Sequence, residues 1–369
     1  MKEIALLFTR LGCLGFGGPF AVISLMEDEF IRRRKWLSPE KFSEMLAVCK
    51  MLPGPIAVQL AIYLALERAG PVAGIVAGVC YIMPAFILVL ALSYFYVRTG
   101  VATSFSVLFQ SLQAGALVVI FFSVIQLGKP YRKSVRSWAI GIASAALIFL
   151  VPRYEPLVIF AFGLSGAYFP TAQRPKLHAF LLPWGLTKVS KDFFTSIYLK
   201  LFWVFFKAGA FVFGSGLAIV PMLEGDTVSH FHWLTHSQFM DGLALGQVTP
   251  GPVVITATFI GYKAAGFTGA IIATFAIFAP AFFNILVLVP KTWARLAKTA
   301  YAKDFVAWAI PSVVGCVFGA ALKLSWISLR GWIPAGVFLM STAFMIWKKP
   351  PAWMLILGAG GLGILAQAV

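Results

Sequence analysis

Charged side chains are scarce in this chain. Asp, Glu, Lys and Arg make up 12% of its 369 residues, whereas about a quarter of the residues in an ordinary soluble domain are charged. The mean hydropathy is +0.89, and apolar residues form long runs such as Val72–Val97, Phe105–Leu127 and Phe267–Val289. A helix needs about 20 residues to cross a hydrocarbon core of about 30 Å. The runs argue against a soluble fold and predict an all-α polytopic membrane protein.

Acidic residues are fewer still, with 13 Asp and Glu against 30 Lys and Arg, and the net charge is +17. On a soluble protein this balance would indicate a nucleic-acid partner. Here the basic residues fall between apolar runs, as in Lys129–Arg136, which is typical of loops that orient membrane proteins. We therefore expect a lipid bilayer around the protein and no nucleic acid.

The ligands that metal sites use are also rare. The four cysteines lie in apolar stretches without a CxxC spacing, as expected of small hydrophobic side chains. His230, His232 and His236 share one segment, but no cysteine or carboxylate is spaced around them as a further ligand. We expect neither a metal nor a cofactor. The chain also lacks a GxxxxGK[ST] motif, which argues against an ATPase domain.

The chain contains an internal repeat. Moved by 197 positions, Arg10–Pro55 aligns without gaps onto Lys207–Pro252, and after one deletion Pro84–Phe86 matches Pro280–Phe282. The identical residues of the first copy are Gly12, Phe16, Gly17, Ala21, Glu27, Trp36, Leu37, Phe42, Leu46, Ala47, Pro53, Gly54 and Pro55. Shared apolar composition does not explain matches in Gly, Pro, Trp and Glu. We divide the chain into repeats at 1–170 and 198–369, joined by a basic cytoplasmic linker at 171–197.

Charge indicates how the repeats are oriented. The segment Glu27–Trp36 carries four basic residues, whereas its counterpart Glu224–Trp233 has no Lys or Arg. Because basic loops stay in the cytoplasm, the two segments should lie on opposite sides of the membrane. Two inverted-topology repeats, a plan common among transporters, give this arrangement.

Two apolar stretches are interrupted by Pro-Gly-Pro. Stretch 42–66 is broken at Pro53–Pro55 and stretch 239–262 at Pro250–Pro252. Each half of a stretch spans only about half a membrane. If both stretches enter and return as re-entrant hairpins, the basic loops fall on the cytoplasmic side. The expected architecture is about ten transmembrane helices plus two broken, re-entrant helical hairpins, with both termini outside.

Paired breaks predict a binding site. A glycine-rich break at Gly15–Pro19 is matched by Phe213–Gly216, and the Pro-Gly-Pro breaks match each other. Irregular backbone at membrane depth is tolerated where it lines a cavity, and a helix starting at such a break aims free N–H groups at it, as anion sites require. Proline kinks or close glycine packing are the alternative. The substrate-binding residues expected at the breaks are Gly17, Gly18, Pro19, Pro53, Gly54, Pro55, Gly214, Ser215, Gly216, Thr249, Pro250, Gly251 and Pro252.

A few polar residues near the breaks extend this site. Arg10 and Lys207 match across the repeat, and two cations suit a dianion; the alternative is that both side chains extend to a membrane surface. Lys50 would be a third cation. Gln59 and Asn284 would add neutral hydrogen bonds, as would Thr249 and Ser215. The repeated acids Glu27 and Glu224 are the expected coupling residues, unless they cap a helix or pair with nearby cations.

The motifs together resemble the chromate ion transporter (CHR) family, in its long two-domain form. The likeness covers both repeats and departs from the family pattern at Gly214–Gly216, where Gly-Ser-Gly replaces Gly-Gly-Pro. The motifs that carry it are Phe16–Pro19, Met26–Leu37, Leu52–Pro55 with Gln59–Ile62, and Pro84–Phe86, repeated as Phe213–Gly214, Trp233–Leu234, Thr249–Pro252 and Pro280–Phe282. The resemblance implies a multi-pass protein of the bacterial inner membrane that exports chromate and confers chromate resistance.

Three other functions stay open at this point. Another tetrahedral oxyanion such as sulfate would be hard to separate from chromate by hydrogen bonding alone. A channel would not need paired broken helices. An integral membrane enzyme would need clustered acids and histidines at one membrane face, and the only such cluster is His230, His232 and His236 beside Asp226 and Asp241. We expect a transporter and not an enzyme; assembly as a homodimer is left open.

Overall fold

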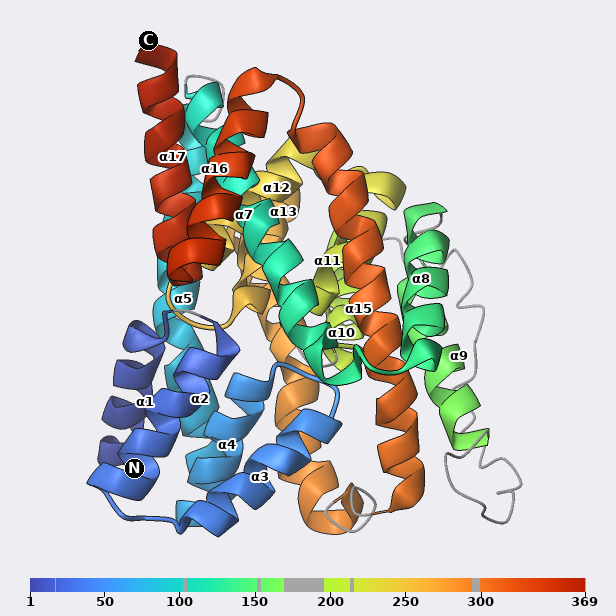
Figure 1. The fold of residues 1–369 in the computed structure, drawn as a ribbon. Coiled ribbons are helices and arrows are strands. Elements are labelled where there is room, and N and C mark those ends of the chain that lie inside the picture. Colours follow the sequence, from blue (N-terminus) through green and yellow to red (C-terminus); the bar gives the residue numbers. More distant parts are fainter. Residues whose placement is uncertain are drawn as a thin grey trace.

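The computed structural model describes residues 1–16, 18–101, 105–150, 154–168, 196–212, 216–293 and 299–368. These residues form helices and short connections, and no strand occurs among them (Figure 1). Large apolar side chains lie exposed on the outside of the bundle, including Phe95, Phe275 and Trp326. A surface of this kind suits lipid rather than water. The all-α membrane fold expected from the sequence is confirmed.

The helices follow one another in the same order in both repeats. The first contains α1 (Lys2–Leu14), α2 (Pro19–Glu27), the π-helical turn η1 (Asp28–Arg33), α3 (Pro39–Met51), α4 (Ile56–Ala69), α5 (Pro71–Thr99), α7 (Ser106–Gly128), η2 (Lys129–Tyr131), α8 (Val135–Leu150) and α9 (Glu155–Tyr168). The second contains α10 (Ile197–Ala210), η5 (Gly216–Ile219), α11 (Val220–Glu224), η6 (Gly225–His230), α12 (His236–Val248), η7 (Val253–Ile255), α13 (Thr256–Phe283), η8 (Asn284–Trp293), α15 (Ala300–Ser328), α16 (Trp332–Lys348) and α17 (Ala352–Ala368).

The repeat seen in the sequence recurs in the backbone. The bounds of α3 and α12 differ by 197 residues at both ends, as do those of η1 and η6. Lys35 and its counterpart His232 both have positive φ, 51° and 53°. Helix α13 is kinked at Gly266, where the first repeat changes from α4 to α5 at Gly70. Of the proposed linker 171–197, residues 171–195 lie outside the described part of the chain.

Each repeat begins with two helical hairpins. In the first repeat, α3 and α4 fold back on each other. Lys41 at the start of α3 pairs with Glu67 at the end of α4, with Nζ 3.1 Å from Oε1. The segment α1–α2 also folds back, because Arg34 pairs with Glu3 and the Phe30 ring packs on Phe8 at 5.8 Å between centroids. The chain reverses at Gly18, which has φ of 84°, a conformation that favours glycine.

The long helices surround these hairpins. Four helices are long and apolar enough to span a membrane, at Pro71–Thr99, Ser106–Tyr131, Val253–Pro290 and Lys303–Ser328. Four apolar helices are shorter, at Val135–Leu150, Glu155–Gly166, Trp332–Lys348 and Ala352–Gln367. A multi-pass protein is confirmed by these helices, and the count of ten spans stays a prediction.

The two repeats exchange packing partners. Helix α15 of the second repeat packs against α8 and α9 of the first, whereas α7 of the first packs against α16 and α17 of the second (Figure 1). The contacts are close: a Cβ on Gly315 would lie 2.0 Å from the Gly141 carbonyl oxygen. Small residues at helix crossings allow this approach of two backbones. The repeats therefore form one interlocked bundle.

Candidate functional site

The tips of the hairpins meet near the centre of the bundle. The Gly54 N–H donates to the Val212 carbonyl at 2.6 Å, and the Gly251 N–H donates to the Gly15 carbonyl at 3.0 Å. Gly54 and Gly251 match across the repeat, and so do Gly15 and Val212. Each Pro-Gly-Pro break is therefore bonded to the end of the first helix of the other repeat. Gly54 and Gly251 have φ of 134° and 103°, which side-chain-bearing residues rarely adopt.

A small cavity lies between these tips, with about 20 Å³ of room in this conformation. Five residues expected to form the site line it, so the structure brings breaks of both repeats to one place. The described lining residues are Gly18, Val22, Pro55, Ile56, Ala57, Tyr81, Gly216, Gly251, Pro252, Val253 and Val254. We refer to this space as the central cavity.

Helix N-termini surround the central cavity. Pro55 precedes α4, and the first helical hydrogen bond closes from the Gln59 N–H to the Pro55 carbonyl at 3.0 Å. Ile56 and Ala57 belong to the first turn of the helix, whose N–H groups have no acceptor within the helix. In the second repeat the 3-10 turn η7 follows Pro252, with the Ile255 N–H donating to the Pro252 carbonyl at 2.9 Å, and α13 continues from it. Two helices of opposite repeats therefore direct their positive dipole ends at the cavity.

Two expected hydrogen-bond donors instead stabilise a break. Gln59 Nε2 and Asn284 Nδ2 each donate to the Pro53 carbonyl at 2.7 Å. Asn284 comes from the other repeat, so this oxygen joins the two halves. The Thr249 hydroxyl likewise donates to the Gly246 carbonyl at 3.1 Å. In this structure these three side chains donate hydrogen bonds to backbone carbonyl groups, whereas the sequence interpretation had assigned them to the substrate.

The expected cations lie away from the described lining of the central cavity. Arg10 and Lys50 are exposed. Lys207 Nζ forms an ion pair with Asp226 at 2.5 Å, and the Asp226 side chain is 3% exposed. Among the remaining expected residues, Pro19 begins α2, and Pro250 follows α12 in its break. Gly17, Gly214 and Ser215 lie outside the described residues.

The two expected coupling acids differ sharply in environment. Glu27 is exposed, whereas Glu224 is 1% exposed. Lys323 Nζ lies 3.1 Å and 3.2 Å from the two Glu224 oxygens, His236 Nδ1 lies 3.2 Å from Oε1, and the Ser229 hydroxyl donates at 3.2 Å. Burial lowers the pKa of His236, against the opposing effect of the Glu224 carboxylate. Sequence reasoning missed Lys323, although a lone lysine within an apolar run is a usable signal.

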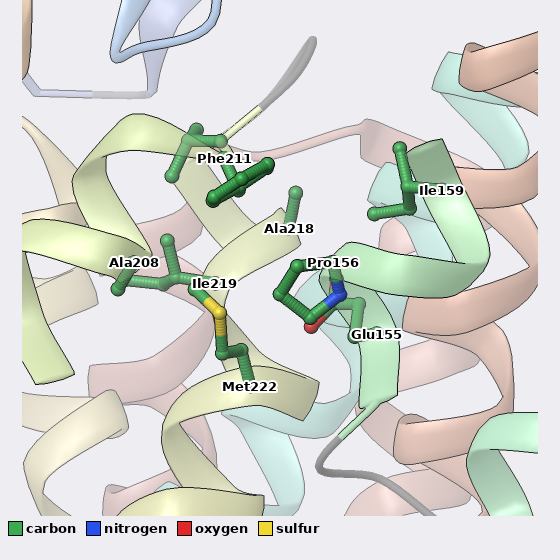
Figure 2. A pocket seen from close by; sticks show the side chains of 9 residues that line it. Glu155, Pro156, Ile159, Ala208, Phe211, Ala218, Ile219 and Met222 are labelled. Atoms are coloured by element: carbon green, nitrogen blue, oxygen red, sulfur yellow. The ribbon is translucent and has the colours of Figure 1, made fainter. Parts of the chain in front are cut away.

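A second buried acid lines a small hollow between α9, α10 and α11. Figure 2 shows Glu155 beside Pro156 and Met222, with Ala208 and Phe211 across the space. The Glu155 side chain is buried, and its Oε2 has no hydrogen-bond partner among the described residues. No sequence pattern indicates this burial, because Glu155 follows an arginine and a tyrosine and is typical of an interhelical loop.

A third buried acid joins three helices. Asp241 of α12 accepts hydrogen bonds from the Tyr96 hydroxyl at 2.6 Å and from Gln113 Nε2 at 2.8 Å. Gln113 also donates to the Ser237 hydroxyl at 3.0 Å. These contacts connect α5 and α7 of the first repeat with α12 of the second.

An apolar bundle with broken helices around a central cavity defines a multi-pass membrane protein with an internal site. The model of the chromate transporter family matches this chain twice, over residues 2–167 and 199–364. The chain belongs to the chromate transporter family.

Curated relatives extend over nearly the whole chain. A chromate transport protein of Cupriavidus metallidurans is 34% identical over 99% of this chain and 93% of its own length. A probable chromate transport protein of Synechococcus elongatus is 32% identical, over 99% and 95%. A chromate transport protein of Pseudomonas aeruginosa is 29% identical, over 96% and 89%. No solved structure matches. These relatives are transport proteins, and the chain is a transporter rather than an enzyme.

Proposed function

We propose that this protein is a secondary transporter that exports chromate from the cytoplasm of a bacterium and so confers chromate resistance. The central cavity carries the proposal, because breaks of both repeats line it and helix N-termini face it. Relatives named as chromate transport proteins support the choice of substrate. A dianion that leaves an inside-negative cell gains about 4.6 kcal/mol per 100 mV, since one charge gains about 2.3. This gain can drive export without ATP.

We further propose that the repeats, 1–170 and 198–369, are inverted in the bacterial inner membrane. Helix α5 and the later part of α13 run antiparallel, since Gly74 lies against Leu286 and Gly78 against Phe282. The reciprocal bonds of Gly54 and Gly251 support the same two-fold relation. The hairpin α3–α4 fits a re-entrant segment, because its two ends lie together at the Lys41–Glu67 pair.

In the proposed site, the anion lies against the N-termini that follow Pro55 and Pro252. Neutral donors of this kind bind an oxyanion without a permanent counter-charge, which favours release on the other side. Arg10 and Lys207 are the proposed cationic partners on the way to the cavity, with Lys50 near the first Pro-Gly-Pro break. Lys207 would have to exchange Asp226 for the anion.

Proton coupling is proposed for Glu224 rather than Glu27. A buried carboxylate paired with Lys323 loses that ion pair when it is protonated, whereas Glu27 is exposed at the matched position. Transport driven by membrane potential alone remains compatible with the same fold. Assembly of two copies into a homodimer is a separate proposal.

The experiment is oxyanion flux in everted membrane vesicles with the membrane potential clamped. We expect uptake of chromate that increases as the vesicle interior becomes more positive, at turnover rates of a carrier. Sulfate is measured in parallel, because a transporter for another tetrahedral oxyanion is the second candidate. Sulfate flux without chromate flux would overturn the substrate; channel-like conductance would overturn the mechanism.

A further inference from the structure

Tyr81 has the largest side chain among the fully buried residues of the bundle. It lies near the middle of α5, is 0% exposed, and lines the central cavity. Its hydroxyl has no hydrogen-bond partner among the described residues. An unpaired buried hydroxyl destabilises a fold, so such a group in a cavity wall indicates a missing partner.

The walls around Tyr81 indicate what that partner is. The described lining contains no carboxylate and no cation. The lining also includes Ile56 and Val253, which stand in the first turns after Pro55 and Pro252, where backbone N–H groups have no acceptor within their own helix. These groups are donors only, and a tyrosine hydroxyl can also donate. Unpaired donors in a described lining that holds no carboxylate fit an anion with several unprotonated oxygens.

We propose that the Tyr81 hydroxyl donates a hydrogen bond to an oxygen of the transported oxyanion, beside the N-terminus of α4. The inference rests on the proposed transport function and names a substrate contact within it. The repeat places Ile277 at the position of Tyr81 in the second half, so this donor has no counterpart there. Among its described lining residues, the cavity therefore offers one side-chain donor from the first repeat and an apolar wall from the second.

A neutral, fixed donor suits a transported ion. Hydrogen bonds to a charged group are stronger than those between neutral groups, yet a hydroxyl does not hold the anion as firmly as a buried cation would. Conduction or transport needs binding that is weak enough for release. Tyr81 thus recognises an unprotonated oxygen of the substrate without trapping it.

The test is Tyr81→Phe, which removes only the hydroxyl. We expect the dissociation constant of purified protein for chromate to rise by about 10- to 100-fold, as for a lost hydrogen bond to a charged group. In the absence of anion, the melting temperature should stay equal or rise, because an unpaired buried polar atom is removed. Tyr63→Phe is the matched control on α4: Tyr63 is half-buried, is absent from the described cavity lining, and its substitution should leave affinity unchanged.

Three outcomes would overturn the inference. Unchanged affinity of Tyr81→Phe would show that the hydroxyl binds a structural water or nothing. A lower melting temperature with unchanged affinity would show a packing role. The affinity for sulfate is measured beside that for chromate. If the unmodified protein binds only sulfate, the proposed substrate fails. A lower affinity of Tyr81→Phe for sulfate would in that case still support the hydrogen bond from Tyr81. If the unmodified protein binds neither anion, both proposals fail.

Discussion

Lys323 of α15 and Glu224 of α11 form an ion pair in which the acid is almost fully buried, with Nζ 3.1 Å and 3.2 Å from the two carboxylate oxygens. The counterpart of Glu224 in the first repeat is Glu27, which is exposed. The pair therefore exists in one repeat only.

Removal of the cation should destabilise the protein. Lys323→Met leaves the Glu224 charge buried and unpaired, and breaking a buried pair costs about 3–5 kcal/mol. We expect the lower end, because the Lys323 side chain is 26% exposed. Thermal unfolding in detergent measures the loss, and adding Glu224→Gln should restore much of it. A double variant as unstable as Lys323→Met would show that the pair is not what holds this region.

Glu224→Gln on its own tests coupling. If Glu224 carries the transported proton, flux per folded molecule should lose its dependence on a pH gradient while the response to membrane potential persists. Glu27→Gln is the control, since Glu27 is exposed at the matched position. The same pH response in both variants as in the unmodified protein would remove these acids from the mechanism.

The hairpin geometry predicts which residues are labelled together. In a cysteine-free background, Arg33→Cys and Glu67→Cys should react with an impermeant reagent from one side, because the Lys41–Glu67 pair brings the two ends of the hairpin together. His232→Cys should react from the opposite side if the repeats are inverted. Labelling of all three from one side would contradict the inversion and leave the hairpin intact.

Glycine at a helix crossing should be irreplaceable. A Cβ at Gly209 would lie 2.0 Å from the Ile277 carbonyl oxygen, and overpacking of this kind typically costs about 1–3 kcal/mol. Gly209→Ala should therefore lower the melting temperature. Gly336→Ala is the matched control on α16, because a Cβ there meets nothing within 4 Å; it should be neutral or stabilising.

Lys207 requires a paired experiment. Lys207→Ala strands the buried Asp226 carboxylate, so both abundance and flux should fall. Asp226→Asn in the same chain should restore abundance. Flux per folded molecule that remains low would support anion binding by Lys207, whereas restored flux would leave the lysine a structural role. Arg10→Ala, which breaks no ion pair in the described structure, should retain abundance and lose flux if Arg10 contacts the anion.

The repeat made the breaks predictable. Gly54 and Gly251 stand in matched Pro-Gly-Pro motifs, and the structure brings both to the centre of the bundle. The reversal between α1 and α2 could not be read in the same way, because a glycine-rich break is compatible with a kink or a turn until the φ of Gly18 is known. The sequence pattern predicts where a helix is interrupted, but it does not predict in which direction the chain continues after the break.

The buried polar partners could not be predicted for a different reason. Tyr81, Lys323 and Glu155 are single polar residues whose surroundings come from helices far along the chain; Tyr96 and Asp241, for example, lie 145 positions apart. No local spacing connects such residues. Conversely, Gln59 and Asn284 were expected to bind substrate because amides near a break can do so, and they bond the Pro53 carbonyl instead.

The exchange of helices between the repeats has a consequence for how the protein is made. Helices α8 and α9 pack mainly on α15, which the ribosome produces more than a hundred residues later. During synthesis the first repeat must wait in the bilayer with these crossing faces, including Gly141, covered only by lipid. Insertion of the first half and completion of its packing are thus separate events in time, and a nascent chain stalled before α15 would expose those faces to the cell's membrane quality control.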